Sequence, residues 1–259
     1  MYKYEKLWYN VVPNEGVKIM SGHSKWANIK RQKESTDSKR ANIFSNIGKE
    51  LTVAVKAGGN DPTLNNRLRD VISKARSNNM PNENIQRCLQ KASGDANGVN
   101  YEEITYEGYG PCGVSIIVDA LTDNKNRAAA DIRSIFTKAG GNMGQMGCVA
   151  YMFNKKGIIV IEKSTKISED DLMMEVLENG AVDFIVEEEY YEIATNPEDL
   201  YTVKHYLESK GYTLIEAEIK MIPDMKKELT EDEENKLQVF LDKLENNDDV
   251  HSVWHNADY

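Results

Sequence analysis

Cysteine is scarce in this sequence: 259 residues contain three, and no two of them form a CxxC pair. Such spacing argues against a disulfide framework or a zinc site and is typical of reduced thiols in a cytoplasmic protein. Long hydrophobic runs are absent too, since no apolar stretch approaches the ~20 residues that span a membrane. Residues 1–19 have no arginine and no apolar segment of signal-peptide length. We therefore expect a cytoplasmic protein without a targeting peptide.

Signatures of catalysis are also missing from the sequence. It contains no GxSxG motif, P-loop or Rossmann fingerprint. His251 and His255 have the spacing of a metal-binding pair, but on a predicted strand they would lie roughly 13 Å apart. His23 has no neighbouring carboxylate to orient it. The sequence therefore predicts a protein that is not an enzyme and that has neither a metal nor another cofactor. Catalysis is the least favoured of the three hypotheses that we consider.

Positive charge is concentrated in one part of an acidic chain with a net charge of -10. Residues 21–94 carry 14 Lys/Arg and 6 Asp/Glu, a net +8, whereas residues 95–259 carry 15 and 34, a net -19. A basic head on an acidic body engages phosphate locally while the body is repelled. The alternative is that the acidic residues serve only to keep the body soluble.

The most informative segment runs from Gly22 to Lys33 and places Trp26 and His23 among four cations. Cations with an interspersed aromatic ring suit a nucleic acid, which offers phosphates and flat bases. The alternative is a solvated basic tail. We expect the contact residues to be Gly22, His23, Ser24, Lys25, Trp26, Lys30, Arg31, Lys33, Lys39, Arg40, Arg67 and Arg69.

Apolar residues at helical spacing predict three helices between residues 35 and 94. Gly58-Gly59 ends the first helix, Asp61-Pro62 is a start signal for the second, and Pro81 opens the third. Leu64 belongs to the predicted apolar stripe of the second helix. The exposed faces are expected to hold the cations, including Lys49, Lys56, Lys74 and Arg76.

Beyond residue 100 the pattern changes to an α+β arrangement. Residues 157–222 read as βαββαβ, the ferredoxin-like order. The last helix and strand, after residue 222, have no partners of their own, so we expect them to complete the sheet that begins at Ile104. This gives three domains: a helical bundle (20–94), a discontinuous α+β domain (95–150 and 223–259) and an inserted ferredoxin-like domain (151–222).

A glycine-rich loop follows the first helix of the middle domain. Four glycines in the eight residues from Gly140 to Gly147 would let backbone amides approach a phosphate, and two methionines add an adaptable apolar surface. The alternative is a loop that needs positive φ angles. The residues expected to face a ligand are Gly140, Gly141, Asn142, Met143 and Gly144.

Several of these segments together resemble the YebC family. They are GHSKWANIK at 22–30, GGNDP at 58–62, LTDNKNR at 121–127, GGNMG at 140–144 and DDV at 248–250, and the likeness extends in order from Met20 to Ala257. Two departures are Cys112 and Cys148, where members often have glycine and serine. The resemblance implies a helical domain followed by a domain that a ferredoxin-like one interrupts.

The resemblance also implies a regulator of gene expression, since members have been called transcriptional regulators and relatives include a mitochondrial translational activator of cytochrome c oxidase. We favour a ribosome-associated factor that binds ribosomal RNA and eases synthesis through proline-rich sequences, because irregular RNA rewards aromatic stacking. DNA remains the alternative partner, with Gln86 and Arg87 on the third helix as base readers. Because the likeness starts at Met20, residues 1–19 are expected to be an untranslated or non-native extension. The alternative is a genuine extension that adds a short strand or a flexible arm.

Overall fold

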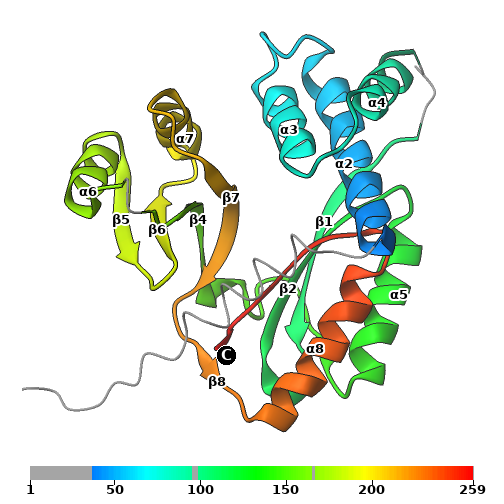
Figure 1. The fold of residues 1–259 in the computed structure, drawn as a ribbon. Helices are drawn as coiled ribbons and strands as arrows, with labels where there is room; N and C mark the ends of the chain where they lie inside the picture. Colours follow the sequence, from blue (N-terminus) through cyan, green and yellow to red (C-terminus); the bar gives the residue numbers. More distant parts are fainter. Residues whose placement is uncertain (1–36, 95–98, 165–166, 259) are drawn as a thin grey trace, which may run out of the picture.

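The N-terminal unit is a bundle of three helices in a computed structural model that describes residues 37–94, 99–164 and 167–258 (Figure 1). The apolar stripes of the helices meet in one core, where Leu51 and Leu68 are fully buried. No helix within the described residues is long and apolar enough to cross a membrane. The helices are α2 (Asp37–Gly58), α3 (Asn66–Ser77) and α4 (Asn82–Gly94).

The second helix, α3, begins later than the sequence predicts. The Asp61 carboxylate accepts hydrogen bonds from the N–H and the hydroxyl of Thr63, at 2.9 and 2.7 Å, and so holds a turn. Asn65 caps α3 instead, because its side-chain oxygen accepts from the N–H of Leu68 at 3.0 Å. The predicted start at Asp61-Pro62 is therefore wrong, and Leu64 lies in the turn, 83% exposed.

The middle unit is a four-stranded antiparallel sheet with two helices on one face. The Phe136 and Phe240 rings of these helices meet edge to face at 5.0 Å. The last strand pairs with β2, so the sheet joins distant parts of the chain, as predicted. In the order of the sheet its strands are β3 (Asn142–Met143), β1 (Glu102–Tyr109), β2 (Ser115–Thr122) and β9 (Val250–His255), and the helices are α5 (Lys125–Lys138) and α8 (Glu231–Glu245).

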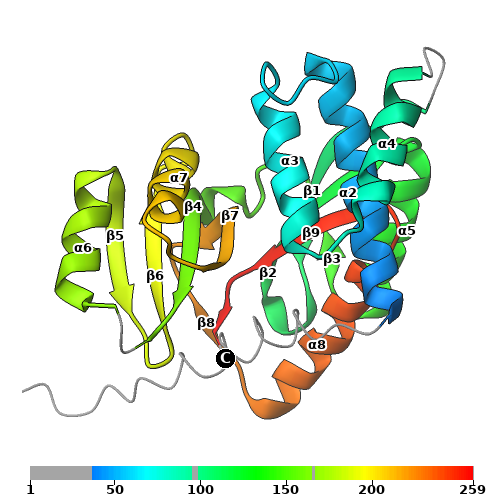
Figure 2. The ribbon, with the colours of Figure 1, turned by 45° about the horizontal axis from the view of Figure 1, so that its top comes forward.

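The third unit is inserted between the two parts of this sheet and has the predicted ferredoxin-like order (Figures 1 and 2). Its antiparallel strands run β5-β6-β4-β7, with both helices packed on one face over Ile159 and Ile193. Its elements are β4 (Phe153–Glu162), α6 (Glu169–Glu178), β5 (Ala181–Val186), β6 (Tyr190–Thr195), α7 (Leu200–Ser209) and β7 (Leu214–Pro223). Short strands β8 (Lys227–Glu228) and β10 (Ala257–Asp258) pair in parallel.

Ion pairs join α2 to the middle sheet. The Arg127 guanidinium donates to both carboxylate oxygens of Asp249 at 2.9–3.0 Å, and the Lys49 ammonium lies 3.6 Å from the same carboxylate. Asn46 donates to the Val250 carbonyl at 2.9 Å. The Lys49 side chain is only 12% exposed, so its predicted place on the open face of the helix is wrong. These contacts fix the helical unit against the sheet.

Lys74 is a half-buried cation. Its ammonium donates to the Glu50 carboxylate at 3.1 Å. Burial lowers the pKa of Lys74, but the negative charges of Glu218 and Glu50 outweigh burial, and the pKa lies above its usual value. The ion pair therefore ties α3 to α2, and the Lys74 side chain, 29% exposed, is not on the open face as predicted.

Two histidines on β9 make stability depend on pH. Burial lowers the pKa of His255 to about 4 and also lowers that of His251. As pH falls, the unfolded chain takes up protons first, near pH 6.5, so the native state loses stability. We expect the free energy of unfolding, measured in urea, to fall by about 2 kcal/mol between pH 6.5 and 5. His255→Gln should remove much of this dependence, and an unchanged pH profile in that variant would contradict the assignment.

Candidate nucleic-acid interface

Most of the predicted contact residues lie outside the described residues. The backbone of Lys39 and Arg40 forms part of the first turn of α2, while their side chains lie outside the described part. The following lie wholly outside the described residues: Gly22, His23, Ser24, Lys25, Trp26, Lys30, Arg31 and Lys33.

The two predicted contacts on α3 have different surroundings. The Arg67 guanidinium forms an ion pair with Glu103 of β1, and the two side chains are 47% and 60% exposed. Such a pair contributes little to stability and opens readily to another anion. Arg69 is exposed and forms no ion pair with any carboxylate of the described residues. Arg69 is therefore the freer of the two toward phosphate.

Three further cations complete the exposed basic surface of α3 and α4. Arg76 lies two turns after Arg69 on α3, and Arg87 and Lys91 lie one turn apart on α4. All three are exposed, and among the described residues none is paired with a carboxylate. Helical spacing alone does not reveal this difference, because Lys49 and Lys74 have the same spacing and are paired with carboxylates. We call Arg69, Arg76, Arg87 and Lys91 the head cations.

The glycine-methionine loop is organised by one buried carboxylate. The Glu107 side chain of β1 accepts hydrogen bonds from the N–H groups of Gly147, Val149 and Ala150 at 2.7, 3.0 and 2.8 Å. Burial raises the pKa of Glu107, but these three donors outweigh burial, and the pKa lies below its usual value. The N–H groups at the end of this loop are therefore already bound to the Glu107 carboxylate and are not available to a phosphate.

The glycines at the start of the loop serve close packing. The N–H of Gly141 donates to the Phe136 carbonyl and that of Gly144 to the Glu107 carbonyl, at 2.9 and 2.8 Å. A Cβ on Gly141 would lie 2.5 Å from the Tyr109 carbonyl oxygen, so only glycine fits there. Gly140 has φ +76°, as expected of a glycine that ends a helix. These amides are committed to the fold.

The loop presents side chains to solvent instead of amides. Met146 is 86% exposed, Tyr151 73% and Tyr109 40%. The predicted ligand-facing residues divide: Asn142, Gly140 and Gly144 are exposed, whereas Met143 packs against the core of the middle unit. Exposed rings and thioethers offer stacking and apolar contact. This loop is suited to flat or apolar groups more than to phosphate.

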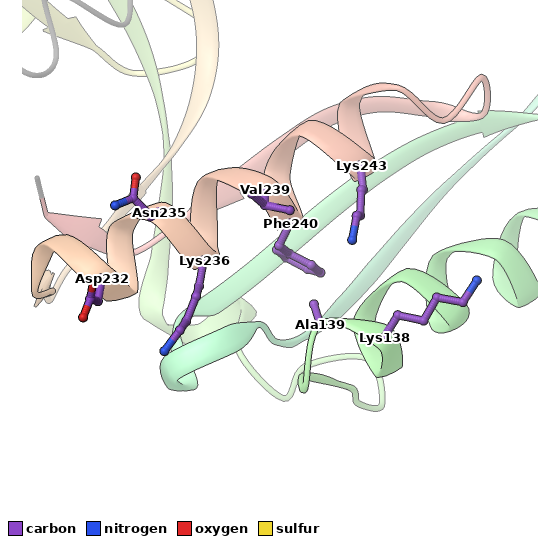
Figure 3. A pocket seen from close by; sticks show the side chains of 8 residues that line it. All are labelled: Lys138, Ala139, Asp232, Asn235, Lys236, Val239, Phe240 and Lys243. Atoms are coloured by element: carbon purple, nitrogen blue, oxygen red, sulfur yellow. The ribbon is translucent and has the colours of Figure 1, made fainter.

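A lysine-lined groove lies next to this loop, between α8 and the end of α5 (Figure 3). It has a volume of about 600 Å³. Its apolar lining comes from Ala139, Val239 and Phe240, and Figure 3 shows three lysine side chains around it. It is a second place where exposed positive charge gathers on the protein. Its lining residues are Lys138, Ala139, Asp232, Asn235, Lys236, Val239, Phe240 and Lys243.

Comparison with known proteins covers almost the whole chain. Residues 24–95 match the TACO1/YebC protein N-terminal domain, and residues 101–257 match the TACO1/YebC second and third domain. A protein of Clostridium botulinum is 56% identical over 93% of this chain and 98% of its own length, and one of Ruminiclostridium cellulolyticum is 57% identical over 87% and 90%. Both are named "Probable transcriptional regulatory protein".

A solved structure agrees with these matches. The crystal structure of a conserved hypothetical protein from Aquifex aeolicus is 41% identical in sequence and superposes with a TM-score of 0.79, covering 90% of this chain and 96% of that one. The likeness therefore extends through all three units. The chain belongs to the TACO1/YebC family.

Proposed function

We propose that this protein is a nucleic-acid-binding regulator of gene expression that acts on the ribosome and eases synthesis through proline-rich sequences. One observation carries the proposal: the head cations are exposed and unpaired among the described residues, on a chain whose remaining part is strongly acidic. Cations that are not needed inside the fold are available to phosphate. The names of the relatives support the general role of a regulator, without specifying the ribosome.

Some cations of the helical unit are paired with carboxylates and others are exposed and unpaired among the described residues, which supports a specific docking surface. Lys49 pairs with Asp249 of the middle unit and Lys74 with Glu50 of α2, while the head cations remain on α3 and α4. The acidic ferredoxin-like unit is repelled by phosphate, so the protein binds only where the head reaches the nucleic acid and the body faces away. The phosphates of ribosomal RNA at an open site of the ribosome fit this requirement.

Aromatic and thioether groups favour irregular RNA over a regular duplex. Trp26 lies among cations in the sequence, and three exposed side chains lie on or beside the loop: Tyr109 at the end of β1, Met146, and Tyr151. Unstacked bases in RNA pack against such side chains. A closed duplex offers no base face to them.

A purified translation system tests the ribosomal role. Adding the protein should speed synthesis through consecutive prolines and leave a proline-poor template unchanged. Trp26→Ala should lose roughly tenfold or more of this effect, because a stacked aromatic contributes about 1–3 kcal/mol per base. The circular dichroism spectrum of the variant should match that of the wild type. If the proline template does not respond, the ribosomal role is wrong.

A DNA-binding transcriptional regulator is the second candidate. Gln86 and Arg87 are both exposed on α4, where a helix in a major groove would present them to adenine and guanine. Selection of bound DNA from a random pool decides between the two. Tight binding of one defined duplex, lost in Gln86→Ala with Arg87→Ala, would favour the transcriptional role.

A further inference from the structure

The outer part of the ferredoxin-like unit has an unusual surface that the proposed function does not use. Of the large hydrophobic side chains that are exposed in the described part of the chain, six lie within fourteen consecutive residues of α6 and β5. Their exposed fractions run from 38% for Met173 to 55% for Met174. Scattered exposed apolar residues are common in proteins, but a gathered set marks an interaction site. The six are Met173, Met174, Leu177, Val182, Ile185 and Val186.

These apolar side chains lie along the outer helix and the edge strand of the unit, with Ile185 on the face of β5 opposite to Phe184 and the core. On α6, Leu172 and Val176 face the core, so Met173, Met174 and Leu177 lie on the outer side of the helix. Among the described residues β5 pairs only with β6, which leaves it at the edge of the sheet beside α6 (Figures 1 and 2). An edge strand and a methionine-bearing helix face together offer an adaptable apolar surface.

The sequence of this surface is acidic, and two lysines lie at its border: Lys210 pairs with Glu175 at 3.8 Å, and the Lys163 N–H donates to the Glu189 carbonyl at 3.0 Å. Residues 169–189 contain nine acidic residues and no lysine or arginine. Glu169, Asp170 and Asp171 occupy the first turn of α6, and Glu187, Glu188 and Glu189 form the turn after β5. Stability of α6 requires acidic residues only at its start, so the acidic turn and Glu178 at the other end of the helix have no role in capping it.

We propose that this surface, the α6–β5 face, binds a protein segment in which lysine or arginine residues flank apolar side chains. The apolar groups of such a segment would cover the methionines and the exposed residues of β5, while its cations would meet the surrounding carboxylates. Nucleic acid is excluded as the occupant by the sign of the charge. The α6–β5 face of a second copy is also acidic, so two such faces would repel each other.

Binding of a designed peptide to the full-length protein tests the α6–β5 face. The probe is a fluorescein-labelled peptide in which lysine alternates with valine, followed by fluorescence anisotropy. Glu178→Lys with Glu189→Lys should weaken binding roughly fivefold, because each exposed charge pair contributes modestly. Glu198→Lys with Glu228→Lys makes the same change in net charge elsewhere and should alter affinity less than about twofold. Equal weakening by the two pairs would overturn the proposal.

A second pair of variants tests the apolar contribution. Met174 and Val239 are each 55% exposed on a helix, so both can be changed to serine without disturbing a core. Met174→Ser should weaken peptide binding roughly fivefold, whereas Val239→Ser should leave it unchanged. Hydrogen exchange of the complex should show protection in residues 169–186. Protection confined to other residues would overturn the proposal.

Two other occupants give distinct results. A molecular mass that rises with protein concentration, and returns to that of the monomer in Glu178→Lys with Glu189→Lys, would identify a second copy and overturn the proposal. Loss of RNA binding in the same variant would also overturn it, since the α6–β5 face would then serve the nucleic acid.

Discussion

Replacing all four head cations by glutamine should weaken RNA binding roughly a hundredfold near physiological salt. Each cation that contacts a phosphate of single-stranded nucleic acid releases about 0.7 counterion, so four contacts account for roughly two orders of magnitude at ~0.15 M salt. The slope of log affinity against log salt should become shallower by roughly three. Fluorescence anisotropy with a labelled single-stranded RNA over a range of salt concentrations measures both quantities.

The matched control removes four exposed cations from the middle unit. Arg133, Lys138, Lys236 and Lys243 lie on α5 and α8, and three of them line the groove in Figure 3. Their replacement by glutamine makes the same change in net charge. If the control loses as much affinity as the head variant, net charge or the groove accounts for binding, and the head cations are not the interface.

Replacing Glu107 by alanine should destabilise the protein by about 3 kcal/mol. The change leaves the N–H groups of Gly147, Val149 and Ala150 without their acceptor, and hydrogen bonds to a charged group contribute about 1.5–3 kcal/mol each when water cannot replace them. The total is smaller than the sum because Gly147 is exposed and water reaches its N–H. Urea denaturation at pH 7 measures the loss.

The pH dependence of this variant provides an internal check. Because the folded-state pKa of Glu107 lies below the usual value near 4.5, its stabilisation is present above that pH and is lost as pH falls through the folded-state pKa. The stability difference between the wild type and Glu107→Ala should therefore become smaller as pH falls through the folded-state pKa. Glu107→Gln keeps one acceptor oxygen and should show an intermediate loss. A loss below about 1 kcal/mol at pH 7 would mean that the loop does not depend on this carboxylate.

The periodic parts of the fold could be predicted from the sequence, because their signals are local. The βαββαβ unit and the return of the last strand to the sheet that begins at β1 followed from counting strands and finding one without a partner; that it pairs with β2 did not. The start of α3 was missed because Asp61-Pro62 satisfies the rules for a helix start, while Asn65 competes for the same role and is the residue that caps the helix.

The site was less predictable, because an exposed cation and a paired one look alike in a sequence. Lys49 and Lys74 differ from Arg69 and Arg76 in having carboxylates from other elements of the fold opposite them. Glu107 gave no signal at all, since its role depends on a loop 40 residues later in the chain. Long-range contacts of this kind carry no local pattern.

The pairing of β9 with β2 also sets the order in which a nascent chain folds. The hairpin of β1 and β2 emerges early, but the edge of β2 that receives β9 stays open until the chain has been made past residue 250. At about 5–20 residues per second, that interval lasts on the order of ten seconds. The ferredoxin-like unit, which ends at Pro223, is synthesised within this interval. During synthesis the middle sheet is therefore the last of the three units to be completed.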